Sequence, residues 1–171
     1  MSSKMSTEGA GGPDASVGSG QYLSFSLGGE EYGLDILKVQ EIRGWESVRQ
    51  LPDMPDYIKG VLDLRGSIVP IVDLRLRFRV GEARYTPTTV IIVVGVESGG
   101  SNRVMGLVVD GVSDVLDVAA DAMRPAPALG ARINTRFIRG MVTRDSRMVV
   151  LLDVDKLLDP DELDLPPGLD V

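Results

Sequence analysis

The stretch YIKGVLDLRGSIVPIVDLRLRF, residues Tyr57–Phe78, is repeated 80 positions later as FIRGMVTRDSRMVVLLDVDKLL, residues Phe137–Leu158. The alignment contains no gap, and most of its apolar positions coincide. In the first copy, two short apolar runs flank a Gly-containing turn, which is typical of a strand–turn–strand unit. A β unit that recurs at a fixed offset indicates an internal duplication. Four aligned pairs are identical: Ile58 and Ile138, Gly60 and Gly140, Val69 and Val149, and Asp73 and Asp153.

A second pair of similar segments lies upstream of the first pair in each half of the chain. The run GLDILKVQEI (Gly33–Ile42) aligns with GLVVDGVSDV (Gly106–Val115) at an offset of 73. Short β motifs can look alike by chance, but two gapless matches in the same order favour duplication. We therefore expect residues 21–85 and 88–158 to be two versions of one small β unit. Each is too small to bury a generous core alone, so we expect two barrels packed together, with a groove between them that would suit a helical partner.

Local patterns support an all-β class. Leu23–Leu27 alternates apolar and polar residues as a half-buried strand does, and Gly28-Gly29 suits a tight hairpin turn. The run Ile36–Trp45 fits both periodicities, and we expect a brief helical turn followed by a strand. Leu74–Phe78 is expected to be a short helix, and the continuous apolar run Val90–Val96 a strand buried on both faces.

The two ends of the chain differ in composition from the part between them. Residues 1–20 are rich in Gly and Ser and contain little to bury, which predicts a disordered tail. Residues 159–171 are acidic and contain Pro, which predicts a second loose tail. The folded domain is therefore expected to span residues 21–158.

Composition excludes much chemistry. The chain has no Cys and no His, so it can form no Ser-His-Asp triad, no imidazole base and no Cys- or His-ligated metal site. Its formal net charge of −7 disfavours nucleic acid, whose phosphates call for a basic surface. No phosphate-binding loop or nucleophile elbow occurs. We expect no catalytic residue, no cofactor and no metal.

Two clusters of acidic residues could suggest a carboxylate site or a calcium site. Asp110, Asp114 and Asp117 are close in sequence, but on a strand Asp114 and Asp117 would point to opposite faces, so we interpret them as solvated. The run Asp153–Glu162 resembles a calcium loop, yet Leu157 and Leu158 stand where that loop needs an oxygen ligand and Gly. A carboxylate-based enzyme on a β scaffold remains a distant alternative.

The chain carries no sequence signal for a membrane or a secretory route. Its longest apolar run is Val90–Val94, extended to Val96, whereas a membrane-spanning helix needs about 20 apolar residues. The N-terminus has no apolar segment of the kind found in secretory signals. We expect a cytoplasmic protein without direct membrane insertion.

Four long strings occur in order along the chain: EEYGLDILKVQEIRG (Glu30–Gly44), YIKGVLDLRGSIVPIVDLR (Tyr57–Arg75), VVDGVSDVL (Val108–Leu116) and RPAP (Arg124–Pro127). Together they resemble the CheW family of bacterial chemotaxis coupling proteins. The resemblance runs from about Gln21 to Leu158 and implies two pseudo-symmetric, five-stranded SH3-like barrels with short helical turns and no enzymatic activity.

The same resemblance implies the partners. Proteins of this family couple transmembrane chemoreceptors, the methyl-accepting chemotaxis proteins, to a CheA-type histidine kinase. One surface meets the regulatory domain of the kinase, and another meets the cytoplasmic hairpin tip of the receptor. The expected location is the cytoplasm, with recruitment to receptor arrays at the inner face of the membrane, and we expect a monomer when the protein is free.

The resemblance also carries over individual positions. Arg124 in the RPAP string matches a region implicated in ring-type contacts to a neighbouring barrel. From spacing alone, the turn Leu64–Gly66 could equally hold an Arg that is merely solvated or one presented to a partner carboxylate. The positions implied to bind receptor or kinase are Val39, Glu41, Arg43, Gly60, Arg65 and Val115.

Two departures from the family pattern affect these expectations. Asp63 stands where the family usually has Asn, and it could pair with a nearby Arg and change the turn. Ala128 and Leu129 follow RPAP where an acidic residue and an aromatic are frequent, which puts the ring contact in doubt. CheV-like proteins, in which the barrels are fused to a receiver, and CheA itself carry the same barrels, but we expect a stand-alone adaptor here. A scaffold of a non-flagellar chemosensory pathway is the nearer alternative.

Overall fold

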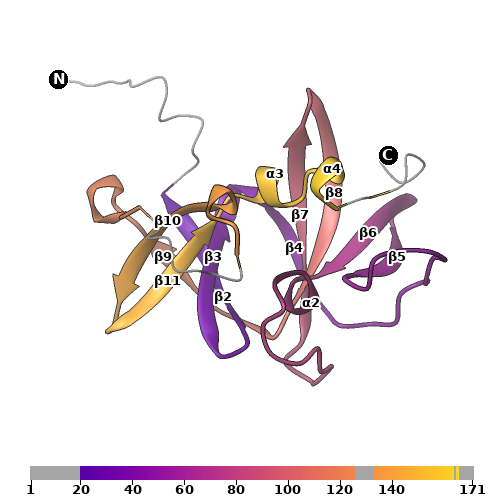
Figure 1. Ribbon diagram of the computed structural model, residues 1–171, viewed down its shortest axis with the longest axis horizontal. Coiled ribbons are helices and arrows are strands. Elements are labelled where there is room, and N and C mark those ends of the chain that lie inside the picture. The colour runs from indigo at the N-terminus through magenta and orange to yellow at the C-terminus, as the bar shows by residue number, and fades with distance from the viewer. Residues whose placement is uncertain (1–19, 126–132, 164, 166–171) are drawn as a thin grey trace.

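A computed structural model describes residues 20–125, 133–163 and 165, and it contains two groups of strands side by side (Figure 1). The helical segments are short: η1 (Ile36–Lys38), α2 (Leu74–Phe78), η2 (Ala120–Ala122), η3 (Thr135–Phe137), α3 (Val154–Leu157) and α4 (Pro160–Leu163). The strands are β2 (Gln21–Leu27), β3 (Glu30–Asp35), β4 (Val39–Gly44), β5 (Ile58–Leu64), β6 (Ser67–Asp73), β7 (Val90–Ser98), β8 (Ser101–Val109), β9 (Gly111–Asp117), β10 (Ile138–Arg144) and β11 (Arg147–Leu152).

The strands form two five-stranded sheets. The first, which we call barrel I, has the order β4-β7-β8-β6-β5, and the second, barrel II, has the order β10-β11-β3-β2-β9. An isolated bridge closes each one: Arg49 pairs with Val61 in barrel I, and Arg124 pairs with Met141 in barrel II. The predicted all-β class with two five-stranded units is confirmed.

The barrels do not coincide with the two halves of the sequence. The β2–β3 hairpin of the first half joins β9, β10 and β11 of the second half, and the β7–β8 hairpin of the second half joins β4, β5 and β6 of the first. The expectation that each half forms its own barrel is therefore wrong, because each repeat gives its first hairpin to the other barrel. The chain crosses from barrel II to barrel I at η1 and returns between β8 and β9.

Two glycines mark equivalent close contacts in this exchange. Gly33 of β3 lies opposite Leu151 of β11, and Gly106 of β8 lies opposite Ile71 of β6, both in parallel pairs. A Cβ at Gly33 would lie 2.9 Å from Leu151 Cδ2, and one at Gly106 would lie 2.6 Å from Ile71 Cδ1. In both repeats a larger residue would therefore require the facing Leu or Ile side chain to move where the exchanged hairpin meets its new neighbour.

Local signals account for the short elements. The predicted helical turn followed by a strand after Ile36 is present as η1 and β4. Helix α2 has the predicted bounds, because the Asp73 carboxylate accepts a hydrogen bond from the Arg75 backbone N–H at its start, and Arg79 ends it in the left-handed conformation (φ 58°). Side-chain capping and a left-handed residue are common helix boundaries.

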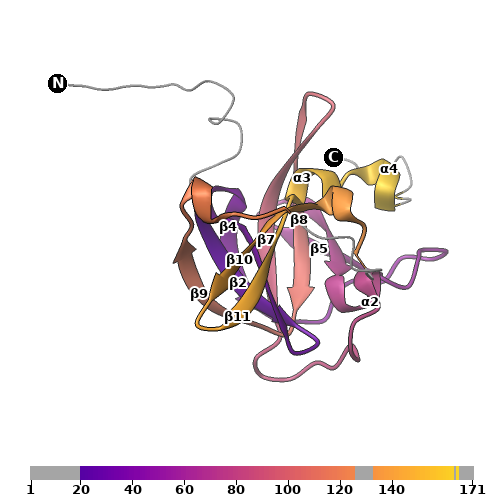
Figure 2. The same ribbon diagram turned by 60° about the vertical axis from the view of Figure 1, so that its left-hand side comes forward.

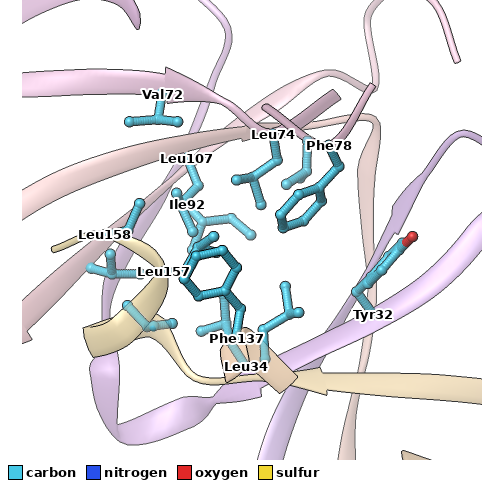
Figure 3. Close-up of a cluster of buried hydrophobic side chains, with 14 of the residues drawn as sticks. Tyr32, Leu34, Val72, Leu74, Phe78, Ile92, Leu107, Phe137, Leu157 and Leu158 are labelled. Carbon is cyan, nitrogen blue, oxygen red and sulfur yellow. The ribbon is translucent and has the colours of Figure 1, made fainter. Parts of the chain in front are cut away.

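A single large apolar cluster fills the seam between the barrels (Figure 3). Leu34 of barrel II, Ile92 and Leu107 of barrel I, and Leu157 of α3 are each fully buried in it. Smaller clusters fill the interiors of the two barrels separately. Burial of apolar surface is the main favourable term in folding, so this seam unites the barrels in one body.

The folded part continues past the predicted boundary at Leu158. Helices α3 and α4 lie at the same end of the molecule as the tip of the β7–β8 hairpin (Figure 2). Leu163 of α4 is fully buried, and its carbonyl accepts a hydrogen bond from the Tyr57 hydroxyl at 3.2 Å. Residues 160–163, which the sequence analysis assigned to a loose tail, are therefore part of the fold, and residues 1–19, 164 and 166–171 lie outside the described residues.

Candidate protein-binding surfaces

Strand β4 forms one edge of barrel I and carries three of the predicted site residues. Val39, Glu41 and Arg43 are each half-buried, whereas Ile42 is 45% exposed. A register shift between Val39 and Glu41 interrupts the pairing of β4 with β7. Such bulges bend an edge strand and re-aim its side chains, and an edge strand is a ready template for a partner.

An ion-pair cluster lies on this edge. The Arg65 guanidinium donates to Glu41 Oε1, and Arg43 Nη1 donates to Glu41 Oε2 at 3.0 Å. Arg43 Nη2 also donates to Glu46 Oε2 at 2.8 Å. Hydrogen bonds from Arg65 and then Arg43 lower the pKa of Glu41, while Glu46 and then Glu41 raise the pKa of Arg43. The cluster thus fixes charged groups of both signs beside the edge strand.

Arg65 is placed by a two-residue turn between β5 and β6. Both Arg65 (φ 53°) and Gly66 (φ 86°) are left-handed, as the preferred two-residue hairpin turn requires. The Asp63 carboxylate accepts a hydrogen bond from the Gly66 backbone N–H at 3.1 Å. The Asp63 side chain therefore stabilises this turn by binding the backbone N–H of Gly66. The sequence suggested instead that Asp63 could pair with a nearby Arg.

Gly60 is a buried backbone position and presents no side chain to a partner. It lies at φ 140°, and a Cβ there would be 2.0 Å from the Arg49 carbonyl oxygen, at the bridge that closes barrel I. A substitution at Gly60 would therefore affect binding only by changing the shape of the barrel.

The other two predicted residues lie on barrel II. Val115 of β9 is 43% exposed, and Arg124 is exposed and itself forms the bridge with Met141. The structure thus separates Val115 and Arg124 from the β4 cluster. Ala128 and Leu129, on which the doubt about a ring contact rested, lie outside the described residues.

The two surfaces are related by the duplication. The alignment places Glu41 and Ile42 on Asp114 and Val115, and both apolar members of these pairs are exposed. Asp114 pairs with Arg144 of β10 at 3.5 Å, as Glu41 pairs with Arg65. Ile42 was not singled out from the sequence, although its alignment with Val115 could have identified it. Leu37, which is 71% exposed at the crossover, had no such signal.

Barrel II also has a polar cavity of about 240 Å³ beside β9. Glu31 lies in it and accepts hydrogen bonds from the Ser24 hydroxyl at 2.8 Å and from Arg147 at 3.3 Å. The remaining lining residues are Ser113, Asp114, Leu116, Arg144, Asp145 and Val149.

The acidic residues considered in the sequence take part in internal contacts. Asp110 accepts hydrogen bonds from Arg75 and from the Gly28 backbone N–H, and Asp117 accepts one from Gln21. Within the described ranges, no three His, Cys, Asp or Glu side chains gather closely enough to hold a metal ion. No helix in that part of the chain has both the length and the apolar character needed to span a bilayer.

Two exchanged barrels with charged and apolar edge strands define an all-β protein-binding module. Residues 21–162 match the CheW-like domain, and the chain belongs to this family. It is 48% identical over 145 residues to the "Chemotaxis protein CheW" of Klebsiella aerogenes, covering 85% of each chain. It is 27% identical over 130 residues to "Chemotaxis protein CheV3" of Helicobacter pylori, covering 75% of this chain and 41% of that one.

A solved structure supports the same assignment. The scaffolding protein TtCheW from Thermoanaerobacter tengcongensis superposes with a TM-score of 0.73 at 32% identity, covering 83% of this chain and 89% of that one. The resemblance inferred from the sequence is confirmed, and with it the class of chemotaxis scaffold proteins.

Proposed function

We propose that this chain is a non-catalytic adaptor that couples chemoreceptors to a CheA-type histidine kinase at receptor arrays in the cytoplasm. Family membership and the 48% identity to a chemotaxis CheW protein support the proposal. The observation that carries it is the ordered ion-pair cluster on the edge of β4, where Arg65 and Arg43 hold Glu41 in place. Pre-positioned charges at the rim of a contact favour the correct partner and the correct register.

The adaptor needs two surfaces that can be occupied at the same time. The β4 surface, made of Val39, Glu41, Arg43 and Arg65, is one of them. The second is the barrel II surface around Val115 and Arg124. Because the two surfaces belong to different barrels, a partner on one leaves the other open. In this assignment Gly60 preserves the barrel without touching a partner.

Titration of the purified full chain tests the proposal. The two ligands are the regulatory domain of a CheA-type kinase and a cytoplasmic hairpin fragment of a chemoreceptor, each followed by calorimetry. We expect micromolar affinity for each and simultaneous binding of both. If neither ligand binds at high micromolar concentration, the adaptor function is wrong. NMR shift mapping with each ligand separately then assigns the β4 and Val115 surfaces to kinase or receptor.

A further inference from the structure

Asp110 links three segments at one end of the seam between the barrels. One carboxylate oxygen, Oδ1, accepts a hydrogen bond from Arg75 Nη1 of α2 at 3.0 Å. The other, Oδ2, accepts one from the Gly28 backbone N–H at the tip of the β2–β3 hairpin, at 2.8 Å. Because α2 packs on barrel I and the hairpin belongs to barrel II, the Asp110 link joins the two barrels.

Asp155 lies on α3, directly after β11 of barrel II, and is hydrogen-bonded to β7 of barrel I. Its Oδ2 accepts a hydrogen bond from Lys38 Nζ at 2.8 Å, and its Oδ1 accepts one from the Glu97 backbone N–H at 2.8 Å. Asp155 is on α3, Lys38 is in the crossover segment η1, and Glu97 is in the β7–β8 hairpin. The Asp155 link therefore also ties a helix, a crossover and an exchanged hairpin together.

The two links use similar but not equivalent groups of the two repeats. The offset of 80 places Arg75 on Asp155, whereas the offset of 73 places Leu37 on Asp110 and Lys38 on Gly111. In one link the helix supplies the cation and the crossover the acid, while in the other the helix supplies the acid and the crossover the cation. In both, one carboxylate oxygen accepts a hydrogen bond from the cation and the other accepts one from a hairpin N–H, that of Gly28 in a turn or of Glu97 within β7.

The links differ in burial. The side chain of Arg75 is 1% exposed and that of Asp110 is 33% exposed, whereas those of Lys38 and Asp155 are 21% and 29% exposed. A charge pair in a more buried setting interacts more strongly and is screened less by salt. The Asp155 link is therefore the more easily opened of the two, and its Lys38 directly precedes Val39 of the β4 surface.

We propose that Asp110 and Asp155 are positioning residues that hold the two barrels in one relative orientation, so that binding at one surface is felt at the other. The coupling between the two surfaces rests on the proposed function. The fixed orientation of the barrels does not, since it can be measured in the free protein. The Asp155 link is the one that a partner on β4 reaches first, through Lys38.

Spin-label distances in the free full-length protein test the orientation. Because the chain has no Cys, the pair Ser67→Cys and Ser113→Cys places one label on each barrel. We expect Asp155→Asn to broaden the distance distribution between the labels, and Asp110→Asn to broaden it further. The matched control is Asp56→Asn, which removes an exposed ion pair with Arg79. An unchanged distribution in Asp155→Asn overturns the proposal even if Asp110→Asn fails to fold.

The coupling is tested by measuring kinase-domain affinity with and without the receptor fragment. Coupling free energies between two sites commonly change affinity about 5- to 150-fold. We expect Asp155→Asn to keep each separate affinity within about twofold while lowering the coupling factor, whereas Asp56→Asn leaves both unchanged. An unaltered coupling factor refutes the link as a transmitter. If the unaltered protein binds neither partner, the adaptor function fails, and the label distances still decide whether the links orient the barrels.

Discussion

Arg65 and Arg79 have nearly the same local setting and differ mainly in where they lie. Their φ angles are 53° and 58°, their side chains are 72% and 70% exposed, and each pairs with a carboxylate, Glu41 or Asp56. Exposed ion pairs contribute little to stability. The position of Arg65 beside β4 is therefore what distinguishes it.

We expect Arg65→Glu to weaken binding to the partner of the β4 surface at least about tenfold, because it places like charges against Glu41 and removes a fixed cation. The thermal midpoint should stay within about 2 °C of the parent value. Calorimetric titration and thermal unfolding measure the two quantities. Arg79→Glu is the control and should change neither. A large fall in the midpoint for Arg65→Glu would show that Arg65 is structural.

Gly60 and Gly140 are equivalent in sequence but differ in what surrounds them. Gly60→Ala must fit a Cβ 2.0 Å from a backbone oxygen at a positive φ, and we expect a loss of about 3 kcal/mol or more in the free energy of unfolding. At Gly140 the nearest atom, 2.3 Å away, belongs to the flexible Met123 side chain, so Gly140→Ala should lose about 1 kcal/mol. Urea unfolding compares them, and equal losses would contradict this explanation.

The pKa of Glu41 reports on the same cluster. Since Arg65 and Arg43 lower the pKa of Glu41 in the folded protein, the stabilisation by these pairs is present above the ordinary glutamate pKa. It is lost as the pH falls through the lowered value. We expect NMR titration of the carboxyl carbon to show Arg65→Gln raising this pKa more than Arg43→Gln does. The opposite order would mean that Arg43 is the main partner of Glu41.

At the scale of elements, the helix caps show how the repeats diverged. Asp73 caps α2 and is fully buried, with its carboxylate also bonded to Arg75 Nε and Nη2 at 2.9 Å and to the Tyr85 hydroxyl at 3.1 Å. Asp153 caps α3 by a single hydrogen bond to the Lys156 N–H at 3.2 Å. Of these two aligned residues, Asp73 therefore forms more hydrogen bonds with its surroundings than Asp153 does.

We expect Asp73→Ala to lower the free energy of unfolding by about 3 kcal/mol or more, because it leaves the buried Arg75 with an incomplete set of partners. Asp153→Ala removes a cap and one favourable charge near Arg139, and it should lower the free energy of unfolding by about 1 kcal/mol. Chemical denaturation followed by circular dichroism measures both. Similar losses in the two variants would contradict the buried ion pair as the cause.

The short elements could be predicted because their signals are local. Leu74–Phe78 follows Asp73, a residue type that caps helices, and the change from a helical turn to a strand falls within the ten residues 36–45, which fit both periodicities. The exchange of hairpins could not, since pairing Gly33 with Leu151 leaves no mark within either segment. Likewise, the burial of Leu163 depends on contacts with distant residues such as Tyr57.

The candidate site also contains features that could be predicted from the sequence and features that could not. Arg65 was placed on a turn from the Gly beside it, and the structure adds its contact with Glu41, 24 residues away. The role of Asp63 was misjudged because a carboxylate can meet either an Arg or a backbone N–H, and the turn conformation decides which. The exposure of Ile42 depends on which residues of β4 are covered in the folded protein. The sequence of the strand does not by itself determine this.

At the scale of the whole molecule, the seam should make the barrels unfold together. We expect Leu157→Ala, in α3, which follows β11 of barrel II and contacts β7 of barrel I, to lower the free energy of unfolding by about 2–5 kcal/mol. Fluorescence of Trp45, the only Trp and part of barrel I, should report the same midpoint as circular dichroism. Leu37→Ala, at a 71% exposed site, is the control and should change little. Separate midpoints for the two probes would show independent barrels.

The exchange of hairpins has a consequence for how the chain can be divided. A cut in the segment between α2 and β7 would leave each fragment with two hairpins and one strand that pairs with neither: β2–β3, β5–β6 and β4 in one, and β7–β8, β10–β11 and β9 in the other. Each fragment offers what the other lacks, so the two together can complete both barrels. The topology is that of a domain-swapped dimer of one repeat whose two copies have been fused end to end.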